Sequence, residues 1–566
     1  MTMNETFEGA AEVKNGVKRL ALTGVAIVLE VLFILLVVLR FNEQAEWFAI
    51  GTRVVSTLLV LLIYNDLKTA SMKMTWIILI MALPIFGATL YLLIGLNGHT
   101  FKMRHRYAEV DARLMPLLPD GDDALARMDA RDRGAANIAR YLKGSSSYPL
   151  YDDTQVTYYD DATKGIEAQK ADLAKAERFI FMEYHAIEDA ESWHAIQDIL
   201  AERVAAGVEV RVFYDDMGSI GFINTDFVKR LEAVGIRGKV FNPFAPGLNL
   251  FLNNRDHRKI TVIDGKVGFT GGYNLANEYF HRTEPYGFWK DTGIRLEGDA
   301  VQSLTVTFLE MWNAVSEYDK DDIDFVKYVA ATDAERVMKR RKKLDAEKAE
   351  RIEKDKEAGF EKVKEGVMRD EKFLAMPGAF AGSGLGFVQP YADSPMDDVH
   401  VGEDVYISMA ESAQKYAWFI TPYLIITDEM CHAFSLAARR GLDVRIITPG
   451  IPDKKIVYSV TRSYYNGLCR NGVRIFEYTP GFCHAKMSIA DDLMATCGTI
   501  NLDYRSLYHH FENGCLYADC DAVMETKKDF EETLAQCREV TEYYTYGRGA
   551  FLRFGQMLLR LAAPLM

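Results

Sequence analysis

One pattern of polar residues occurs twice in this chain with identical spacing, and it constrains the fold more than any other feature. The first copy consists of His257, Lys259, Asp264 and Asn274, and the second of His484, Lys486, Asp491 and Asn501. A glycine lies three positions before each Asn. Chance does not duplicate four residue types at the same intervals, so the pattern predicts two related domains built from one repeated unit.

The residue types in the two copies indicate phosphodiester chemistry. His and Lys lie two positions apart on a strand-like segment, so both side chains point to one face. Lys and Asn can donate hydrogen bonds to phosphate oxygens, while one His attacks phosphorus and the other protonates the leaving oxygen. We expect each Asp to bond the far ring nitrogen of its own His.

The same residues predict a reaction without a metal or any other cofactor. The two ammonium groups already supply positive charge, and neither a His-Glu-x-x-His motif nor a pair of cysteines adjoins either copy. The seven cysteines are an odd number and do not form a disulfide framework, which favours a reducing compartment. Cys483 and Cys497, which flank the second copy, are expected to be small buried residues.

Alternating helices and strands are predicted from about residue 150 onward, as in Val208–Tyr214 and Val444–Thr448, which are typical buried strands. A mostly charged stretch, Asp333–Lys372, divides this part into two halves and is expected to be a solvated insert without chemistry. The predicted organisation is a membrane anchor (1–100), a linker (101–149), a first catalytic domain (150–325), the insert (326–376), a second catalytic domain (377–546) and an amphipathic C-terminal segment (547–566). That last segment is expected either to lie on the membrane surface or to pack on the catalytic domain.

Apolar runs near the start predict two or three transmembrane helices. Leu20–Leu39 and Thr75–Leu96 have the length that a spanning helix needs, whereas Val54–Tyr64 is short. Basic residues from Lys102 to Arg113 follow the last run, so the positive-inside rule favours catalytic domains in the cytoplasm. The predicted location is therefore the cell membrane, with a multi-pass anchor. The net charge of −14 disfavours a nucleic-acid partner.

The duplicated His-x-Lys-x-x-x-x-Asp pattern with its trailing Asn resembles the phospholipase D superfamily, and its context resembles bacterial cardiolipin synthases. The segments that carry this second resemblance are Thr75–Gly87, Tyr214–Ser219, Asn254–Lys259, Thr421–Tyr423 and Asn501–Ser506. The chain departs from the family in its charged insert and in having Gly272 and Thr499 where Ser often follows the motif glycine. Neither departure removes a catalytic group.

The resemblance implies two pseudo-symmetric α/β/α sandwich domains with one active site between them. It also implies that His257 takes a phosphatidyl group from one phosphatidylglycerol, and that His484 protonates the glycerol and then activates a second phosphatidylglycerol. The product would be cardiolipin. The two histidines could exchange these roles, because the copies are nearly symmetric.

Four further residues are predicted to contact substrate: Glu183, Arg258, Tyr423 and Arg505. Glu183 and Tyr423 follow apolar strands at matching places before each motif, and the two arginines could hold a second phosphate. Structural hydrogen bonds or surface ion pairs are the alternatives. Glu278 and Glu512 are expected to anchor the motif loops.

The motifs leave the acceptor open. A hydrolytic phospholipase D, or a transferase that uses another alcohol, would carry the same residues. A catalytically silent scaffold that binds anionic lipid is disfavoured by two intact copies, and a nuclease by the apolar runs and acidic charge. The expected partners are phosphatidylglycerol, cardiolipin and the lipid bilayer, and the oligomeric state, a homo-oligomer included, stays open.

Overall fold

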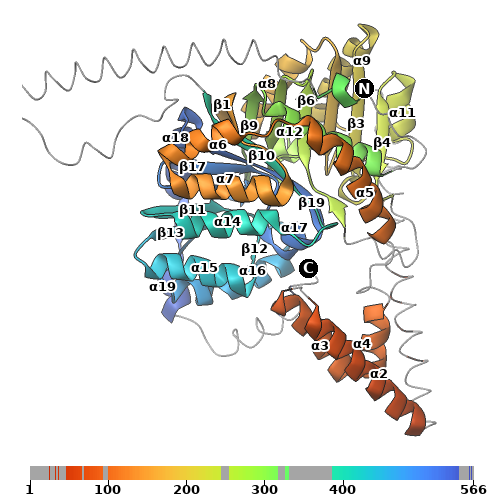
Figure 1. Ribbon diagram of the computed structural model, residues 1–566, viewed down its shortest axis with the longest axis vertical. Coiled ribbons are helices and arrows are strands. Elements are labelled where there is room, and N and C mark those ends of the chain that lie inside the picture. Colours follow the sequence, from red (N-terminus) through yellow and green to blue (C-terminus); the bar gives the residue numbers. More distant parts are fainter. Residues whose placement is uncertain are drawn as a thin grey trace, which may run out of the picture.

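The computed structural model describes residues 46–66, 69–92, 100–243, 254–315, 325–329 and 385–546, and single residues at 25, 28, 32, 36, 560 and 563. Two α/β halves lie side by side in it, and a group of three helices extends away from them (Figure 1).

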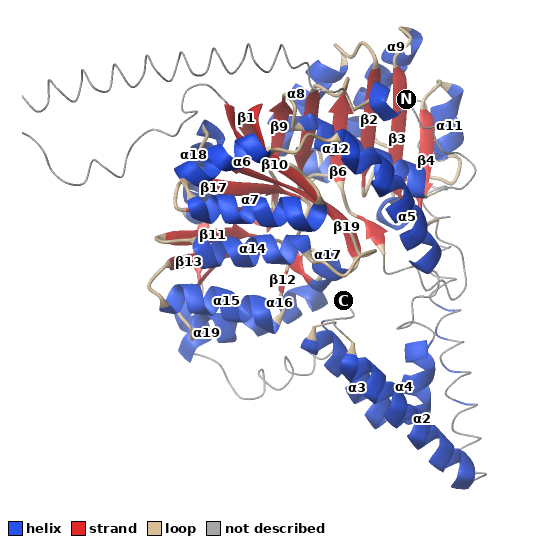
Figure 2. Ribbon diagram, viewed as in Figure 1, coloured by secondary structure: helices blue, strands red, loops and turns tan. Residues whose placement is uncertain are grey.

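The first half consists of seven strands with helices on both faces (Figure 2). Its strands are β1 (Tyr151–Tyr159), β2 (Phe179–Tyr184), β3 (Glu209–Asp215), β4 (Arg237–Phe241), β6 (Lys259–Ile263), β7 (Val267–Gly271) and β9 (Gly293–Glu297), in the order β4-β3-β2-β6-β7-β9-β1. Its helices are α8 (Ala162–Leu173), α9 (Glu191–Ala205), α10 (Asp216–Ser219), α11 (Phe227–Ala233) and α12 (Val301–Ala314), with short 3-10 turns at Asn277–Phe280 and Phe325–Lys327. Every residue of α12 is buried.

The second half repeats this order. Its strands are β10 (Leu385–Asp393), β11 (Tyr416–Ile420), β13 (Asp443–Pro449), β14 (Arg474–Tyr478), β16 (Met487–Ala490), β17 (Met494–Gly498), β19 (His510–Ala518) and β20 (Cys537–Glu539), in the order β20-β14-β13-β11-β16-β17-β19-β10. Its helices are α14 (Val401–Ser412), α15 (Asp428–Arg439), α16 (Lys455–Cys469), α17 (Tyr504–Tyr508), α18 (Asp521–Leu534) and α19 (Thr541–Tyr546). β20 adds an edge strand that has no counterpart among the described residues of the first half.

The two halves join into one sheet through β1 and β10, which pair antiparallel with Tyr151 opposite Val388. Outward from this pair, the strands of both halves follow in matching sequence. The duplication predicted from the motifs is thus a pair of repeated α/β domains related by pseudo-twofold symmetry. Two short parallel pairs cross between the halves: β5 (Arg255–Asp256) with β19, and β15 (Gly481–Cys483) with β8 (Phe288–Lys290).

Residues 101–149, expected to be a linker, form helices that pack on the catalytic domains. They are α5 (Thr100–Leu114), a 3-10 turn at Met115–Leu117, α6 (Asp122–Arg131) and α7 (Arg133–Ser146). Apolar residues at helical spacing, such as Ile138 and Leu142, are fully buried in the main hydrophobic core, because α7 packs against α14. The segment is therefore part of the catalytic body.

The anchor region is described only from Glu46, as α2 (Glu46–Asn65), α3 (Ala70–Ala82) and α4 (Pro84–Leu90). The run Thr75–Leu96, expected to be one span, is broken at Leu83, because Pro84 lacks the N–H that would continue the helix. Among the described helices, none combines the length and apolar character that crossing a bilayer requires. Most of Leu20–Leu39, of the charged insert and of the C-terminal segment lies outside the described residues.

Candidate active site

Each motif histidine is held in place by the opposite domain. The backbone N–H of His257, just after β5, donates to the carbonyl of Phe511 at 2.9 Å. The backbone N–H of His484, just after β15, donates to the carbonyl of Lys290 at 2.7 Å. The two copies of the motif therefore meet at the boundary between the domains and form one site.

A buried carboxylate from the opposite domain orients each imidazole. Nδ1 of His257 lies 2.9 and 3.0 Å from the two carboxylate oxygens of Glu512, and Nδ1 of His484 lies 2.7 Å from Oδ2 of Asp291. Burial raises the pKa of both carboxyl groups, but the facing histidine outweighs it and holds each pKa below its ordinary value. An ionised carboxylate only accepts hydrogen bonds, so Nδ1 carries the proton and Nε2 is left for chemistry.

The motif aspartates have a different role from the one expected. The carboxylate of Asp264 accepts from the backbone N–H groups of residues 177, 178 and 179, at 2.9, 2.7 and 2.9 Å. Asp491 accepts in the same way from residues 414, 415 and 416. Both aspartates lie in the turn after the motif strand with positive φ, at the end of the strand remote from the histidine. They fix the turn to the neighbouring strand and do not contact the imidazoles.

The motif lysines lie beside the histidines, in surroundings that disfavour their positively charged form. Nζ of Lys259 donates to the carbonyl of His257 at 2.6 Å, and Nζ of Lys486 lies 2.9 Å from Nε2 of His484. Burial lowers the pKa of Lys259 to about 7 and that of Lys486 to about 8, and for Lys259 the nearby charge of Lys486 adds to the effect. A bound phosphate anion would relieve this electrostatic stress.

Burial also keeps both histidines neutral. It lowers the pKa of His257 to about 3 and that of His484 to about 4, despite the carboxylates that face them. A neutral imidazole with Nδ1 protonated has a lone pair on Nε2, which is what a nucleophile or a general base needs.

The two motif asparagines differ in their contacts. Oδ1 of Asn274 accepts from the backbone N–H of Ala186 at 3.1 Å, and its Nδ2 donates to the hydroxyl of Tyr279 at 2.8 Å. Asn501 is 5% exposed, and its Oδ1 accepts no hydrogen bond from the described residues. Asn274 thus positions Tyr279, whose ring centroid lies 5.3 Å from that of His484.

Arg258 and Glu183, predicted to contact substrate, lie beneath the site. Both side chains are fully buried and 3.8 Å apart. Arg258 alternates with His257 and Lys259 along the chain, so its guanidinium points the other way and donates to the carbonyl of Thr307 and the hydroxyl of Tyr107, each at 3.1 Å. Neither residue is placed to hold a second phosphate.

The other two predicted contacts, Tyr423 and Arg505, are not buried beneath the site. The hydroxyl of Tyr423 donates to Asp453 at 2.5 Å, and its ring lies 6.3 Å from that of Phe482, which is 5.9 Å from His484. Arg505 is exposed on α17. Glu278, on the 3-10 turn at Asn277–Phe280, is half-buried, and its pKa is raised to about 7 by burial and by the charge of Glu188.

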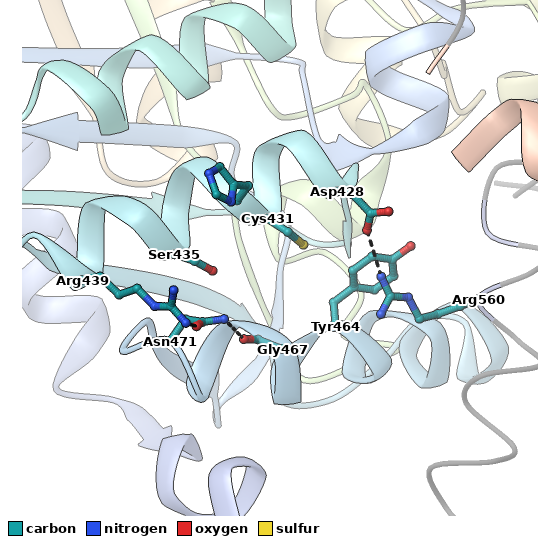
Figure 3. Close-up of a pocket in the computed structure, with 9 residues that line it drawn as sticks. Asp428, Cys431, Ser435, Arg439, Tyr464, Gly467, Asn471 and Arg560 are labelled. Carbon is teal, nitrogen blue, oxygen red and sulfur yellow. Dashed lines mark hydrogen bonds and ion pairs between the residues drawn. The ribbon is translucent and has the colours of Figure 1, made fainter. Parts of the chain in front are cut away.

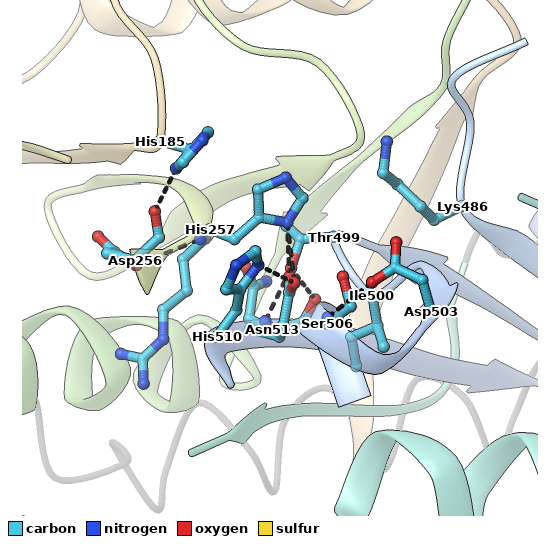
Figure 4. Close-up of polar contacts among 12 residues, drawn as sticks. His185, Asp256, His257, Lys486, Thr499, Ile500, Asp503, Ser506, His510 and Asn513 are labelled. Atoms are coloured by element: carbon cyan, nitrogen blue, oxygen red, sulfur yellow. Dashed lines mark hydrogen bonds and ion pairs between the residues drawn. The ribbon is translucent and has the colours of Figure 1, made fainter. Parts of the chain in front are cut away.

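Rings that sequence reasoning missed flank both histidines. His257 lies between His185 and His510, with ring centroids 4.9 and 5.5 Å away (Figure 4). His484 lies near Tyr279 and Trp289, and the Trp289 ring is 5.4 Å away. The pseudo-symmetric site is therefore polar around one catalytic histidine and aromatic around the other.

Asp291 was also missed, although the sequence contains a signal for it. Asp291 and Glu512 each stand two positions before a glycine, Gly293 and Gly514, which lie in the corresponding strands β9 and β19. His185 and His510 belong to no repeated pattern, so the sequence offered no such signal for them.

Among the described residues, one cluster of three side chains could hold a metal ion. It consists of His257, His510 and Glu512, whose ligand atoms lie within 4.8 Å of one another. Glu512 is already engaged by His257, and two lysines share the site. This charge arrangement fits an anion better than a divalent cation.

A separate pocket of about 390 Å³ lies between α15 and α16, away from the histidines (Figure 3). Arg560 from the C-terminal segment contributes to it, lying 4.3 Å above the Tyr464 ring and 3.5 Å from Asp428. This one described residue of the segment's basic face packs on the catalytic domain. None of the predicted catalytic residues lines the pocket.

Two repeated domains that share paired His-Lys motifs at their boundary define the class of enzyme, and comparison with known proteins specifies it. The model of the cardiolipin synthase, PLD-like domain matches residues 170–312 and 406–534, and the phospholipase D-nuclease N-terminal model matches residues 54–95. Cardiolipin synthase 2 of Bacillus cereus is 30% identical over 505 residues, which cover 89% of this chain and 88% of the relative. An uncharacterized protein of Streptococcus mutans is 38% identical over 506 residues, covering 89% and 98%.

Among solved structures, phosphatidylserine synthase of Haemophilus influenzae has the same fold, with a TM-score of 0.50 and 15% identity over 76% of this chain and 97% of that one. The chain belongs to the bacterial cardiolipin synthase family of the phospholipase D superfamily. It is a phosphatidyltransferase by this membership.

Proposed function

We propose that this enzyme transfers a phosphatidyl group from one phosphatidylglycerol to another, giving cardiolipin and glycerol, through a phosphohistidine. One observation carries the proposal. Each histidine is oriented through Nδ1 by a buried carboxylate of the opposite domain, so that both Nε2 atoms and both lysines belong to one site.

In the first step, Nε2 of His257 attacks phosphorus and the bond to the headgroup glycerol oxygen breaks. His484 gives its Nε2 proton to that oxygen, and glycerol leaves. The phosphate anion supplies the negative charge that raises the pKa of His484 from its low value. Lys259, Lys486 and Asn501 donate to the non-bridging oxygens as charge develops on them.

In the second step, His484 is neutral and acts as general base. It takes the proton from a glycerol hydroxyl of a second phosphatidylglycerol, whose oxygen attacks phosphorus and breaks the bond to His257. Glu512 stabilises the positive charge on the His257 ring while the phosphoryl group is attached. Hydrolysis would follow the same course with water as acceptor, so excluding water from the site decides between synthase and hydrolase.

We also propose that the enzyme is a multi-pass membrane protein with its catalytic domains in the cytoplasm. The match of residues 54–95 to an N-terminal family model and the outward-facing apolar residues of α2, among them Leu58, Leu61 and Leu62, support membrane association. Labelling of single cysteines introduced into the loops, in intact and in opened cells, tests the orientation.

The proposal is tested with purified full-length protein in liposomes of phosphatidylglycerol alone, with the products identified by mass. Cardiolipin and glycerol are expected from the wild type and from His194→Ala, an exposed histidine on α9 that serves as control. His257→Ala should abolish both products, and His484→Ala should abolish cardiolipin and release at most one glycerol per enzyme molecule. Phosphatidic acid without cardiolipin would instead indicate a hydrolase.

A further inference from the structure

An exposed segment that follows β13 and includes the first two residues of α16, Ile451–Ile456, combines apolar and basic side chains. Ile451 is 40% exposed and Ile456 is 61% exposed, which is unusual for large aliphatic residues in the catalytic domains. Lys454 and Lys455 lie between them, and the Lys454 side chain is 67% exposed. We call Ile451–Ile456 the 451–456 loop.

The basic residues of this loop are placed against the ordinary rules of helix stability. Lys454 is the N-cap of α16 and makes no capping hydrogen bond, Lys455 is the first residue of the helix, and the first turn contains no acidic residue. The N-terminus of a helix already carries partial positive charge, so two lysines there are unfavourable in water. A local sequence that opposes stability in this way is typical of a functional surface.

The loop is connected to the catalytic centre by aromatic rings. Asp453 of the loop accepts the hydrogen bond from the Tyr423 hydroxyl, and Nζ of Lys454 lies 5.7 Å from the Tyr423 ring centroid. From Tyr423 the contacts continue to Phe482, whose ring lies 4.9 Å from Trp289 and 5.9 Å from His484. This aromatic wall gives an apolar path from the loop to the histidine.

The N-terminal helices contact the same edge of the second domain. β13 ends at Pro449, directly before the loop, and the neighbouring short strand β12 (Leu424–Ile425) pairs in parallel with β18 (Leu502–Asp503). α17 follows β18 at once, and Met72 of α3 packs against the main hydrophobic core, to which Tyr504 of α17 belongs. The apolar helices and the 451–456 loop therefore lie at one edge of the second domain.

We propose that the 451–456 loop is a membrane-contact surface, through which a lipid leaves the bilayer for the active site. Ile451 and Ile456 insert among the lipids, and Lys454 and Lys455 meet anionic headgroups, in a chain that is otherwise strongly acidic. The lipid then enters beside Tyr423 and lies along the aromatic wall toward His484. This inference rests on the proposed function, since it takes phosphatidylglycerol as the substrate.

A fluorescence experiment tests the contact without requiring turnover. Full-length Ile456→Trp is placed in nanodiscs of equimolar phosphatidylglycerol and phosphatidylcholine with brominated acyl chains, and its emission is compared with that of the wild type in the same discs. The control is Met524→Trp, which is 49% exposed near the start of α18, just after the end of β19 that is remote from the active site. The proposal predicts added quenchable emission for Ile456→Trp alone. No quenching of Ile456→Trp, or equal quenching of both variants, would overturn it.

A kinetic experiment separates lipid delivery from chemistry. The double variant Ile451→Ser, Ile456→Ser should lose about tenfold in rate on phosphatidylglycerol in liposomes, since it buries less apolar surface in the bilayer. On a short-chain, monomeric phosphatidylglycerol its rate should equal that of the wild type. Equal losses on both substrates would overturn the proposal, as would no loss on liposomes. If the wild type converts neither substrate, the proposed function fails, while the quenching result still decides the membrane contact.

Discussion

The carboxylate that faces His257 offers the sharpest test of how this site works. Glu512→Gln keeps the shape of the side chain but removes its charge, 2.9 Å from Nδ1 of His257. At an effective dielectric constant of about 20, two unit charges at this separation attract by at most about 6 kcal/mol. The amide dipole of Gln retains part of this attraction, so we expect a loss of about 4 kcal/mol when the ring becomes cationic. That corresponds to about a thousandfold in kcat.

Asp264→Asn is the matched control, because Asp264 belongs to the repeated motif but its carboxylate contacts only the backbone. Its carboxylate accepts three backbone hydrogen bonds, and an amide NH₂ in its place would face N–H donors. We expect this variant to lose about 2 to 3 kcal/mol of folding stability but to keep kcat per folded molecule within about fivefold. Thermal unfolding and cardiolipin formation by mass separate the two effects.

The opposite ranking would refute this reasoning. If folded Asp264→Asn were inactive while Glu512→Gln kept a tenth or more of the wild-type kcat, then the motif aspartate, and not the cross-domain carboxylate, would support the histidine. Asp291→Asn should behave as Glu512→Gln does, because Asp291 faces His484 in the same way.

Three further outcomes are expected. The kcat/KM should fall as pH rises through about 7 to 8, since Lys259 and Lys486 lose their positive charge above their lowered pKa values. Lys259→Arg should move this limb to higher pH, because Lys259 has the lower of the two pKa values, and a flat profile from pH 5 to 9 would contradict the prediction. Prolonged treatment with EDTA should leave the rate of cardiolipin formation within about twofold, whereas its full loss, restored by a metal, would contradict a reaction run by His and Lys alone. Arg258→Met should lower the free energy of unfolding by about 3 kcal/mol, because it leaves Glu183 buried without its cation. A raised KM for lipid with unchanged thermal stability would instead indicate that Arg258 contacts the substrate.

The repeated motif was sufficient to predict the duplicated α/β fold. Spacing along a strand fixes which side chains share a face, so the placement of His257 next to Lys259 follows from local geometry. The same rule, applied to Arg258, predicts that it points away, yet its charge suggested a phosphate contact. Local alternation was the better guide.

The contacts between domains were not predictable in this way. Asp291 and Glu512 reach the histidine of the other half because β8 and β19 each pair with a short strand across the boundary. Such pairing depends on the packing of elements far apart in the sequence. The packed helices of residues 101–149 were missed for a related reason, since their apolar faces gain a partner only when the second domain folds against them.

The measurement that tests the central claim most directly is the capture of the covalent intermediate. His484→Ala lacks both the acid of the first step and the base of the second. Over a long incubation with phosphatidylglycerol it should therefore slowly accumulate a phosphatidyl group on His257, found by mass spectrometry of peptides kept at alkaline pH. His257→Ala should form no adduct. An adduct on His484 in the His257→Ala protein would reverse the roles of the two histidines. The absence of any adduct from His484→Ala and from rapidly quenched wild-type enzyme, while the wild type still makes cardiolipin, would contradict the two-step mechanism.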